Sequence, residues 1–237
     1  MIGMKKYTVF VHVVSNLVII ALLFGLYLAC APRSNAVSAS APIYKGNADE
    51  KRVALMINVY EGTEYVEGMM DVLDRFGETA TFFVGGVWAE KNVELVKRIR
   101  LSFDIGNHGY LHKDHAALSY AQNKAEIELC DKLVYAATGK KMNLFAPPSG
   151  SMGEEMKKVC SDLGYKIIMW SKDTIDWRDK DEDKVYLRAT TDVKSGDFIL
   201  MHPTAHTLRA LPEILRTLRQ NGFVTATVSE LVGVRLV

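Results

Sequence analysis

The stretch VALMINVYEGTEY, residues 53–65, contains the strand, the loop and the helix start that decide the fold. Its first seven residues are all apolar except Asn58. Such an apolar run is typical of a strand buried on both faces. Four apolar or aromatic residues at helical spacing follow: Tyr65, Met69, Val72 and Phe76. The stretch therefore predicts a strand, loop and helix in succession, with Asn58 near the carboxyl end of the strand.

Six further short apolar runs predict strands, at residues 80–84, 103–106, 143–146, 166–170, 197–201 and 223–227. Amphipathic segments lie between them, with apolar stripes over 127–137 and 208–218. Seven strands alternating with helices fit either an open doubly wound sheet or a closed barrel. No glycine-rich dinucleotide motif follows the first strand, and polar residues gather after strand ends, which favours a parallel barrel.

The N-terminal residues 1–31 predict a membrane segment. Two lysines precede residues 8–31, which contain no aspartate, glutamate, lysine or arginine. About 20 apolar residues span a bilayer, whereas the apolar core of a signal peptide has about 7–15. We expect an uncleaved transmembrane signal-anchor in the cell membrane, with the following domain outside the cytoplasm. A cleaved signal and a secreted domain are the alternative.

The remaining chain is predicted to consist of a flexible tether, residues 32–50, and one domain, residues 51–237. Lysine plus arginine (29) nearly balance aspartate plus glutamate (28), so no basic excess is available for nucleic acid. Cys130 and Cys160 fall on apolar faces of predicted helices. Export permits a disulfide between them, but the pattern favours two buried free thiols.

Ionisable residues follow three of the predicted strands. His108 and His112 have the spacing HxxxH, which suits a metal if the backbone turns helically between them. His202 follows the run FILM and is suited to general acid chemistry, or else is a satisfied core histidine. Asp173 and Asp176 can bind a metal, orient a histidine or cap a turn, and capping is the simplest role for Asp176. His115 is expected to be a solvated loop residue.

These stretches together resemble the polysaccharide deacetylase family, metal-dependent carbohydrate esterases that remove N-acetyl groups from chitin oligomers and peptidoglycan. The family's first motif is a strand ending in Thr-Phe-Asp-Asp-Gly, with Ala-Thr-Phe-Phe about twenty residues later. The five motifs correspond here to MINVY with ATFFV (80–84) downstream, HGYLH (108–112), APPSG (146–150), DTIDW (173–177) and ILMH (199–202). The resemblance covers Lys51 to Leu231 and implies a distorted (β/α) barrel of about seven parallel strands.

The resemblance implies a role for each matched residue. His108 and His112 would bind a divalent metal, zinc or cobalt-like, that polarises the acetamide carbonyl and a water molecule. Asp173 would orient His202, and His202 would protonate the leaving amine. Trp177 and Leu200 would line the acetyl pocket. The partner would be an acetylated glycan of the peptidoglycan or chitin type.

The sequence departs from the family at three of its catalytic positions. Asn58 stands where the family has its aspartate base, and it would remain as a substrate-binding amide. Val59 stands at the third metal ligand and Ala146 at the arginine that holds the base, while Ser149 replaces the tyrosine of the third motif. Glu61 is the candidate for a substitute catalytic base or ligand, and a solvated surface role is its simpler alternative.

Two main hypotheses follow from this mixture of retained and lost residues. The first is a membrane-anchored extracytoplasmic deacetylase with weak or altered activity and weakened metal affinity. The second is a catalytically inactive relative that binds a cell-wall or spore-wall glycan or a partner. A metal-dependent hydrolase of another bond, with Glu61 as base, is a third possibility.

Overall fold

The computed structural model describes residues 12, 14–23, 26, 41–47 and 49–233, and the chain divides into two compact units, Met1–Val37 and Ser38–Val237. In the first unit, residues 14–23 are helical and exposed. No helix among the described residues is both long enough and apolar enough to span a bilayer. Most of the predicted membrane segment 1–31 lies outside the described residues, so the transmembrane helix stays a prediction.

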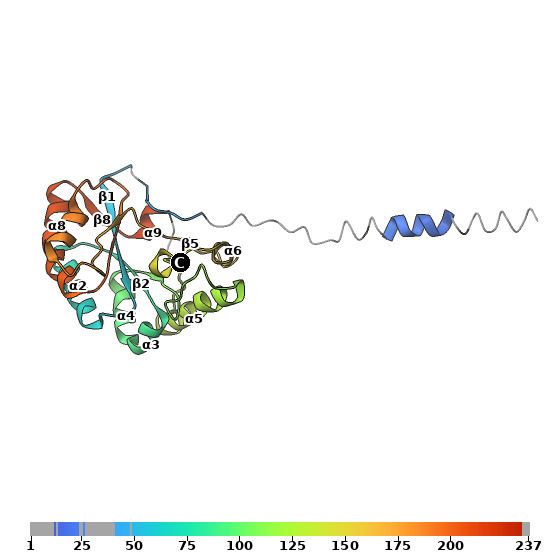
Figure 1. Cartoon of the computed structure of the whole chain (residues 1–237), viewed down its shortest axis with the longest axis horizontal. Coiled ribbons are helices and arrows are strands. Elements are labelled where there is room, and N and C mark those ends of the chain that lie inside the picture. The colour runs from blue at the N-terminus through green and yellow to red at the C-terminus, as the bar shows by residue number, and fades with distance from the viewer. Residues whose placement is uncertain (1–11, 13, 24–25, 27–40, 48, 234–237) are drawn as a thin grey trace, which may run out of the picture. The chain divides into compact units, whose positions relative to one another are not determined.

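The second unit is built on a parallel sheet (Figure 1). Its eight strands are β1 (Arg52–Val59), β2 (Thr81–Val84), β3 (Asp104–Asn107), β4 (Leu144–Phe145), β5 (Lys166–Ile167), β6 (Lys172–Asp173), β7 (Phe198–Met201) and β8 (Val224–Ala226). Their order is β5-β4-β3-β2-β1-β7-β6, and β8 pairs with the first part of β1. The predicted α/β architecture is confirmed, and the strand β6 is an addition that no apolar run reveals, because both of its residues are charged.

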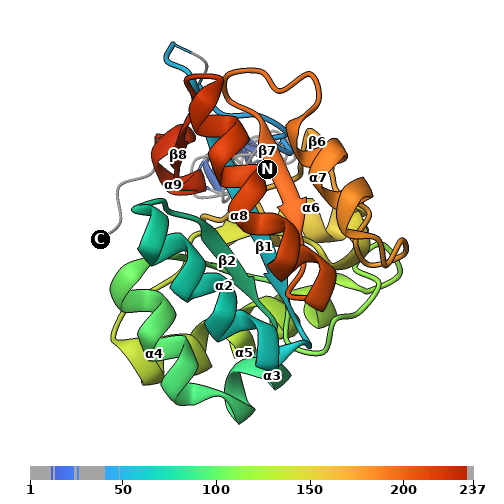
Figure 2. The same cartoon turned by 90° about the vertical axis from the view of Figure 1, so that its left-hand side faces the viewer.

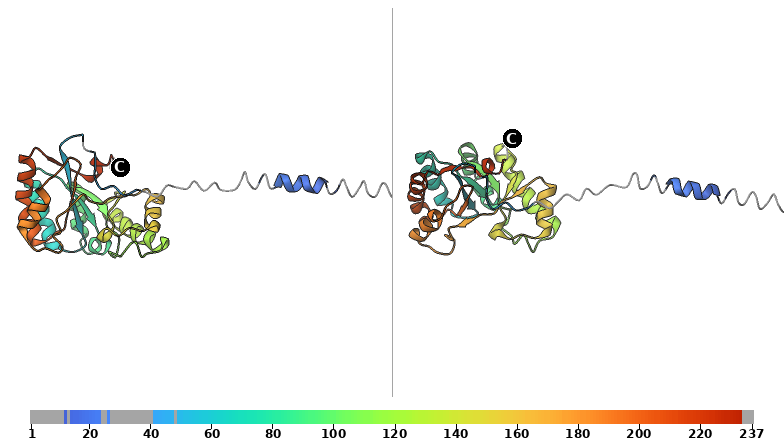
Figure 3. Two further views of the ribbon diagram at one scale, coloured as in Figure 1. Left: turned by 45° about the horizontal axis from the view of Figure 1, so that its top comes forward. Right: turned by 90° about the horizontal axis from the view of Figure 1, so that it is seen from above.

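Helices cover the outside of the strands (Figures 2 and 3). They are α2 (Thr63–Phe76), α3 (Gly86–Lys91), α4 (Val93–Ser102), α5 (Tyr120–Thr138), α6 (Glu154–Asp162), α7 (Glu182–Thr190), α8 (Ala205–Gln220) and α9 (Val228–Leu231). Gly77, in the left-handed conformation, ends α2, and Ser119 with Gln122 forms a capping box that starts α5. Most residues of the predicted apolar stripes are buried on α2, α5 and α8.

The barrel is open between its end strands, and a segment from before β1 bridges the gap. Among the described residues no ladder joins β5 to β6. Ile43 pairs with Ile168 beyond β5, while Lys45 pairs with Asp197 before β7. The Lys45 Nζ atom also lies 2.7 Å from the buried Asp197 carboxylate. These residues fall within the predicted tether 32–50, and this part of it is attached to the barrel.

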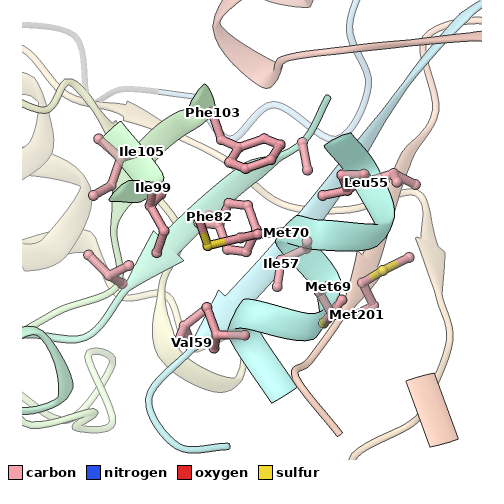
Figure 4. Close-up of a cluster of buried hydrophobic side chains, with 14 of the residues drawn as sticks. Leu55, Ile57, Val59, Met69, Met70, Phe82, Ile99, Phe103, Ile105 and Met201 are labelled. Carbon is pink, nitrogen blue, oxygen red and sulfur yellow. The ribbon is translucent and has the colours of Figure 1, made fainter. Parts of the chain in front are cut away.

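Successive side chains of β1 point to opposite faces of the sheet. Leu55, Ile57 and Val59 belong to the core between the strands and the outer helices (Figure 4). Ala54 and Met56 face the barrel interior, in a smaller core with side chains from β2 and β7. By this alternation Asn58 belongs to the interior face at the carboxyl end of β1, whereas Val59 belongs to the helix-covered face.

The two cysteines of the domain are both buried and free. Cys130 lies on α5 and its thiol donates to the Val84 carbonyl oxygen at 3.3 Å. Cys160 lies on α6, with its sulfur 3.5 Å from the sulfur of Met156. Burial raises the pKa of each thiol to about 12. The predicted free thiols are therefore confirmed, and both are unreactive in the folded protein.

Candidate glycan-binding site

A cavity of about 410 Å³ opens at the carboxyl ends of the strands. Its lining residues are Asn58, Tyr60, His108, His112, Ser149, Trp170, Asp173, Trp177, Leu200 and His202. They come from segments between residues 58 and 202 that meet because parallel strands end at one edge. Every site residue predicted from the sequence lines this cavity except Glu61.

His108 occupies the deep part of the site and has a fixed orientation. Its side chain is 1% exposed, and its Nδ1 atom donates to the Ala146 carbonyl oxygen at 2.7 Å. Burial, together with the nearby His112, lowers the pKa of His108 to about 3. The ring is therefore neutral at pH 7, with its proton on Nδ1 and a lone pair on Nε2.

The pair of histidines is brought together by a loop and not by a helical turn. The ring centroids of His108 and His112 lie 5.1 Å apart. Gly109 and His112 both adopt left-handed backbone conformations, with φ of 74° and 53°. The Glu126 carboxylate on α5 accepts hydrogen bonds from the Tyr110 and Leu111 amides and so holds the loop. Burial lowers the pKa of His112 as well.

His115, in the same loop, is buried instead of solvated. Its Nδ1 atom donates to the Asn123 side-chain oxygen at 2.7 Å. The amide group of Asn123 in turn donates to the His115 carbonyl oxygen at 3.2 Å. The expectation of a solvated residue is wrong, because α5 packs over this loop and supplies a polar partner for the ring.

Tyr60 is a site residue that the sequence analysis missed. Its ring lies 4.0 Å from the ring of His112, with 31° between the planes, and about 6 Å from those of His108 (6.2 Å) and His202 (6.3 Å). Burial and the neighbouring Glu61 carboxylate raise the pKa of the phenol, so it stays neutral. The signal was present in the sequence, because Tyr60 takes the position of the glycine that ends the family's first motif.

His202 is oriented by Asp176. Its Nδ1 atom donates to the Asp176 Oδ1 atom at 2.7 Å, and its backbone amide donates to Oδ2 at 2.6 Å. The Thr207 hydroxyl also donates to Oδ2. Burial alone would raise the pKa of Asp176, but the hydrogen bonds and charge of His202, with the Thr207 hydroxyl, lower it overall. Asp176 is therefore a buried carboxylate that fixes the orientation of the His202 imidazole ring.

The predicted assignment of this contact to Asp173 is corrected accordingly. Asp173 Oδ1 accepts from the Ile175 amide at 2.8 Å, which forms a local turn, and its side chain is half-buried at the cavity. Ile175 has φ of 53°, and this left-handed residue reverses the chain between the two acids. The backbone turn sends Asp176 beneath His202 and leaves Asp173 facing the cavity.

Three of the departures from the family motifs, at positions 58, 59 and 146, have distinct structural consequences. Asn58 is 3% exposed, and its Oδ1 atom is buried with no hydrogen-bond partner within the described part of the chain. Ala146 is buried in the interior core, where its methyl group makes no polar contact. Val59 is fully buried in the outer core, away from the cavity.

Glu61 lies beside the main cavity. It is exposed and lines a neighbouring hollow of about 150 Å³, together with Lys180, Thr204 and His206. Asn58, Tyr60, Trp177 and His202 border both spaces. A carboxylate in this position does not join His108 and His112 around a common centre, so the geometry gives no support to Glu61 as a replacement ligand.

The residues present do not fit the metal site of the deacetylases. A catalytic zinc site uses three protein ligands and an open position. Within the described ranges, no group of three or more histidine, cysteine, aspartate or glutamate side chains could hold a metal ion. His108 and His112 retain the family's positions, but the side chain at the third position, Val59, has no lone pair and points into the core.

The fold and this site define a deacetylase-type barrel with an altered centre, and comparison with known proteins agrees. The family model for polysaccharide deacetylase matches residues 45–168. The chain therefore belongs to the polysaccharide deacetylase family. It is 30% identical to a peptidoglycan-N-acetylglucosamine deacetylase of Bacillus cereus over 191 residues, covering 77% of this chain and 89% of that protein.

Two further similar proteins are one without a stated activity and one described as a pseudoenzyme. The uncharacterised protein YlxY of Bacillus subtilis is 36% identical over 191 residues, or 80% of this chain, and the chain spans only 60% of its length. A solved structure of BA3943, described as a family-four carbohydrate esterase pseudoenzyme from Bacillus anthracis, is 35% identical. It superposes with a TM-score of 0.78 over 81% of this chain and 69% of that one.

Proposed function

We propose that this domain binds amino-sugar glycans of the peptidoglycan or chitin type and has lost efficient hydrolysis. The observation that carries the proposal is the position of Val59, whose side chain packs in the outer core where the family needs a metal ligand. Asn58 in place of the base removes a second requirement, and loss of a general base costs about 10²–10⁴ in rate. The similarity to a pseudoenzyme of known structure supports the same conclusion.

The retained cavity is suited to a sugar. Its volume of about 410 Å³ falls in the usual range for small-molecule sites. Trp177 is 57% exposed beside it, while Tyr60 and Trp170 add aromatic surface to the wall. Aromatic faces can pack against the C–H faces of pyranose rings, and the polar side chains of the cavity can form hydrogen bonds with the sugar substituents. The site has therefore lost catalytic groups without losing a shape that binds glycan.

Residual deacetylation is the second candidate function. The His202–Asp176 pair has the geometry of an oriented acid, which glycan binding alone does not require. The two histidines His108 and His112 also face the same cavity. A mutant of the related BA3943 is described as having restored enzymatic activity, so a comparable scaffold can support the reaction.

For the location, we propose a cell-membrane protein with the barrel outside the cytoplasm. The support is the apolar sequence of residues 8–31 behind two lysines. Fractionation of the producing cell and N-terminal sequencing of the mature chain test this proposal. Recovery of the intact N-terminus from the membrane fraction is expected, and recovery of a shortened chain in the medium would instead show a cleaved signal.

The test of the proposed function uses the full-length chain. Zinc or cobalt is added, excess ion is removed, and bound metal is measured by elemental analysis. Acetate release from N-acetylglucosamine oligomers and peptidoglycan fragments is measured in parallel, with the B. cereus deacetylase as positive control. Binding of the same glycans is measured by calorimetry. Glycan binding with little metal and no turnover is expected, whereas metal-dependent acetate release abolished by His108→Ala would establish the second candidate.

A further inference from the structure

The bridging segment, residues 43–47, packs against the same interior core as one wall of the cavity. It precedes β1 in the chain and crosses the gap between the end strands of the barrel. Trp170 lines the cavity and packs against the interior core. Ile43 packs against this core as well. The bridging segment and this cavity wall therefore share buried neighbours.

Ile43 pairs with the chain just before Trp170. The Ile43 amide donates to the Ile167 carbonyl oxygen at 2.8 Å, and the Met169 amide donates to the Ile43 carbonyl oxygen at 2.8 Å. Met169 is 7% exposed, so displacement of Ile43 would leave a buried amide without its acceptor, which is costly. The bridging segment therefore holds the residue that precedes Trp170.

The residue that follows Trp170 is held from the other side of the gap. The Ser171 hydroxyl donates to Asp197 Oδ1 at 2.8 Å, and the Ser171 amide donates to the Phe198 carbonyl oxygen at 3.2 Å. Lys45 of the bridging segment places its Nζ atom 2.7 Å from the same Asp197 oxygen. The bridging segment thus contacts Met169 on one side of Trp170 and the partner of Ser171 on the other.

Trp170 depends on these neighbours for its position. It makes no backbone–backbone hydrogen bond with another of the described residues. The edge of its ring lies close to Gly150, where a Cβ atom would approach Trp170 Cη2 to 2.9 Å. Gly150 follows Ser149, which also lines the cavity. A displacement of the indole ring would therefore change the shape of this part of the cavity.

Given the proposed glycan binding, on which this inference rests, we propose that the bridging segment is a positioning element of the glycan site. Ile43 sets Trp170 in the cavity wall, so docking of the segment and binding of glycan stabilise each other. Linkage makes this effect reciprocal. A segment that is docked only part of the time lowers the apparent affinity for glycan, and bound glycan in turn keeps the segment docked. No covalent step is involved.

The test is a double-mutant cycle between Ile43 and Trp170 in the full-length chain. Binding of the N-acetylglucosamine pentamer and of peptidoglycan fragments is measured by calorimetry for wild type, Ile43→Ala, Trp170→Ala and the double variant. Ile43→Ala is expected to weaken binding about threefold and Trp170→Ala about tenfold. The double variant is expected to bind like Trp170→Ala, because Ile43 acts through the indole ring.

Two results of this cycle would overturn the proposal. One is an Ile43→Ala variant that binds glycan as tightly as wild type. The other is a double variant in which the two losses multiply to about thirtyfold, because the residues then act independently.

Tyr44→Ala is the matched control in the same segment. The Tyr44 side chain is 46% exposed and lies between the two bridging residues, Ile43 and Lys45. The control is expected to bind glycan within about twofold of wild type. Equal losses in Tyr44→Ala and Ile43→Ala would overturn the specific role of Ile43. Circular dichroism and thermal unfolding establish that the variants are folded.

Hydrogen exchange supplies a readout in the wild-type protein that requires no variant. The amides of Met169 and Gly46 report opening of the bridging segment, since Gly46 donates to the Gly196 carbonyl oxygen at 2.8 Å. Saturation with the pentamer is expected to slow exchange at both amides severalfold. Glycan binding with unchanged exchange at both amides would overturn this inference and leave the proposed function intact. Failure of every glycan to bind would overturn both.

Discussion

Asp176 holds His202 by two hydrogen bonds, one from the imidazole Nδ1 atom at 2.7 Å and one from the backbone amide at 2.6 Å. The carboxylate is 1% exposed and also accepts from the Thr207 hydroxyl. One side chain therefore joins the β6–α7 loop, the end of β7 and the start of α8. This contact ties the geometry of the site to the stability of the barrel.

Asp176→Asn is expected to lower the free energy of unfolding by about 1–3 kcal/mol, because one amide oxygen cannot serve three donors. Urea unfolding at pH 7 measures the change. Asp173→Asn is the matched control, with an expected change within about 0.5 kcal/mol, since it is half-buried and an amide oxygen can still accept from the Ile175 amide. Equal effects of the two substitutions would contradict the assignment of the orienting role.

Asn58→Asp is expected to raise the affinity for zinc, whereas Val59→Asp is expected to lower the stability of the domain. Asn58 lines the cavity with His108 and His112, so a carboxylate there supplies a third ligand and raises zinc affinity. Val59 is buried in the apolar core, and a carboxylate there is expected to cost about 3 kcal/mol or more of unfolding free energy. Elemental analysis after zinc loading, with urea unfolding, measures both effects. A gain of zinc in Val59→Asp without loss of stability would show that the end of β1 turns the other way.

Asp197→Ala is expected to destabilise the barrel by about 2–3 kcal/mol. The buried carboxylate accepts from the Ser171 hydroxyl and the Lys194 amide and pairs with Lys45, so its removal leaves a part-buried hydroxyl and a part-buried amide without their acceptor. Lys45→Met is the control, with an expected cost below about 1 kcal/mol because Lys45 is half-exposed. Thermal unfolding of both variants checks the difference. A larger loss of stability in Lys45→Met than in Asp197→Ala would show that Lys45, in the segment before β1, contributes more to stability than the Asp197 carboxylate.

Asp104 gives a pH dependence whose sign follows from its burial. It is 1% exposed, and burial raises its pKa although Thr81 and Ser229 donate to it. The unfolded chain therefore loses this proton at a lower pH than the folded protein, and the contribution of Asp104 to stability falls as pH rises above 3.8. Urea unfolding of wild type and Asp104→Asn between pH 4 and about pH 7 tests this. As pH rises, the wild type should lose stability relative to Asp104→Asn. A difference in unfolding free energy that stays constant with pH would contradict the raised pKa.

The sequence anticipated much of this architecture for a physical reason. Strands buried on both faces need continuous apolar runs, so the seven longer strand candidates were visible as runs such as VALMINV and ATFFV. The strand β6 carries no such signal, because its two residues, Lys172 and Asp173, are both charged and it forms only by pairing with β7. The motif residues also met as expected, since parallel strands deliver their following loops to one face.

Sequence spacing was a weaker guide to individual side chains. Asp173 and Asp176 are three residues apart after the same run, and only the left-handed turn at Ile175 decides which of them reaches His202. Asn58 and Val59 are adjacent, yet they face opposite sides of β1 because the strand continues through Val59 in register with Val84. Tyr60 enters the site because the chain turns directly after this strand.

The sequence by itself determined the family, the parallel α/β architecture and the set of strand ends that form the site, because these follow from local apolar patterns and motif order. The tertiary structure alone decided which acid orients His202, that Val59 points away from the cavity and that Asn58 Oδ1 is buried without a partner. These outcomes depend on backbone turns and on contacts between segments more than 25 residues apart along the chain, such as Asp176 and His202 (|i−j| = 26). No local pattern specifies such contacts, since each side chain is placed by neighbours from elsewhere in the barrel.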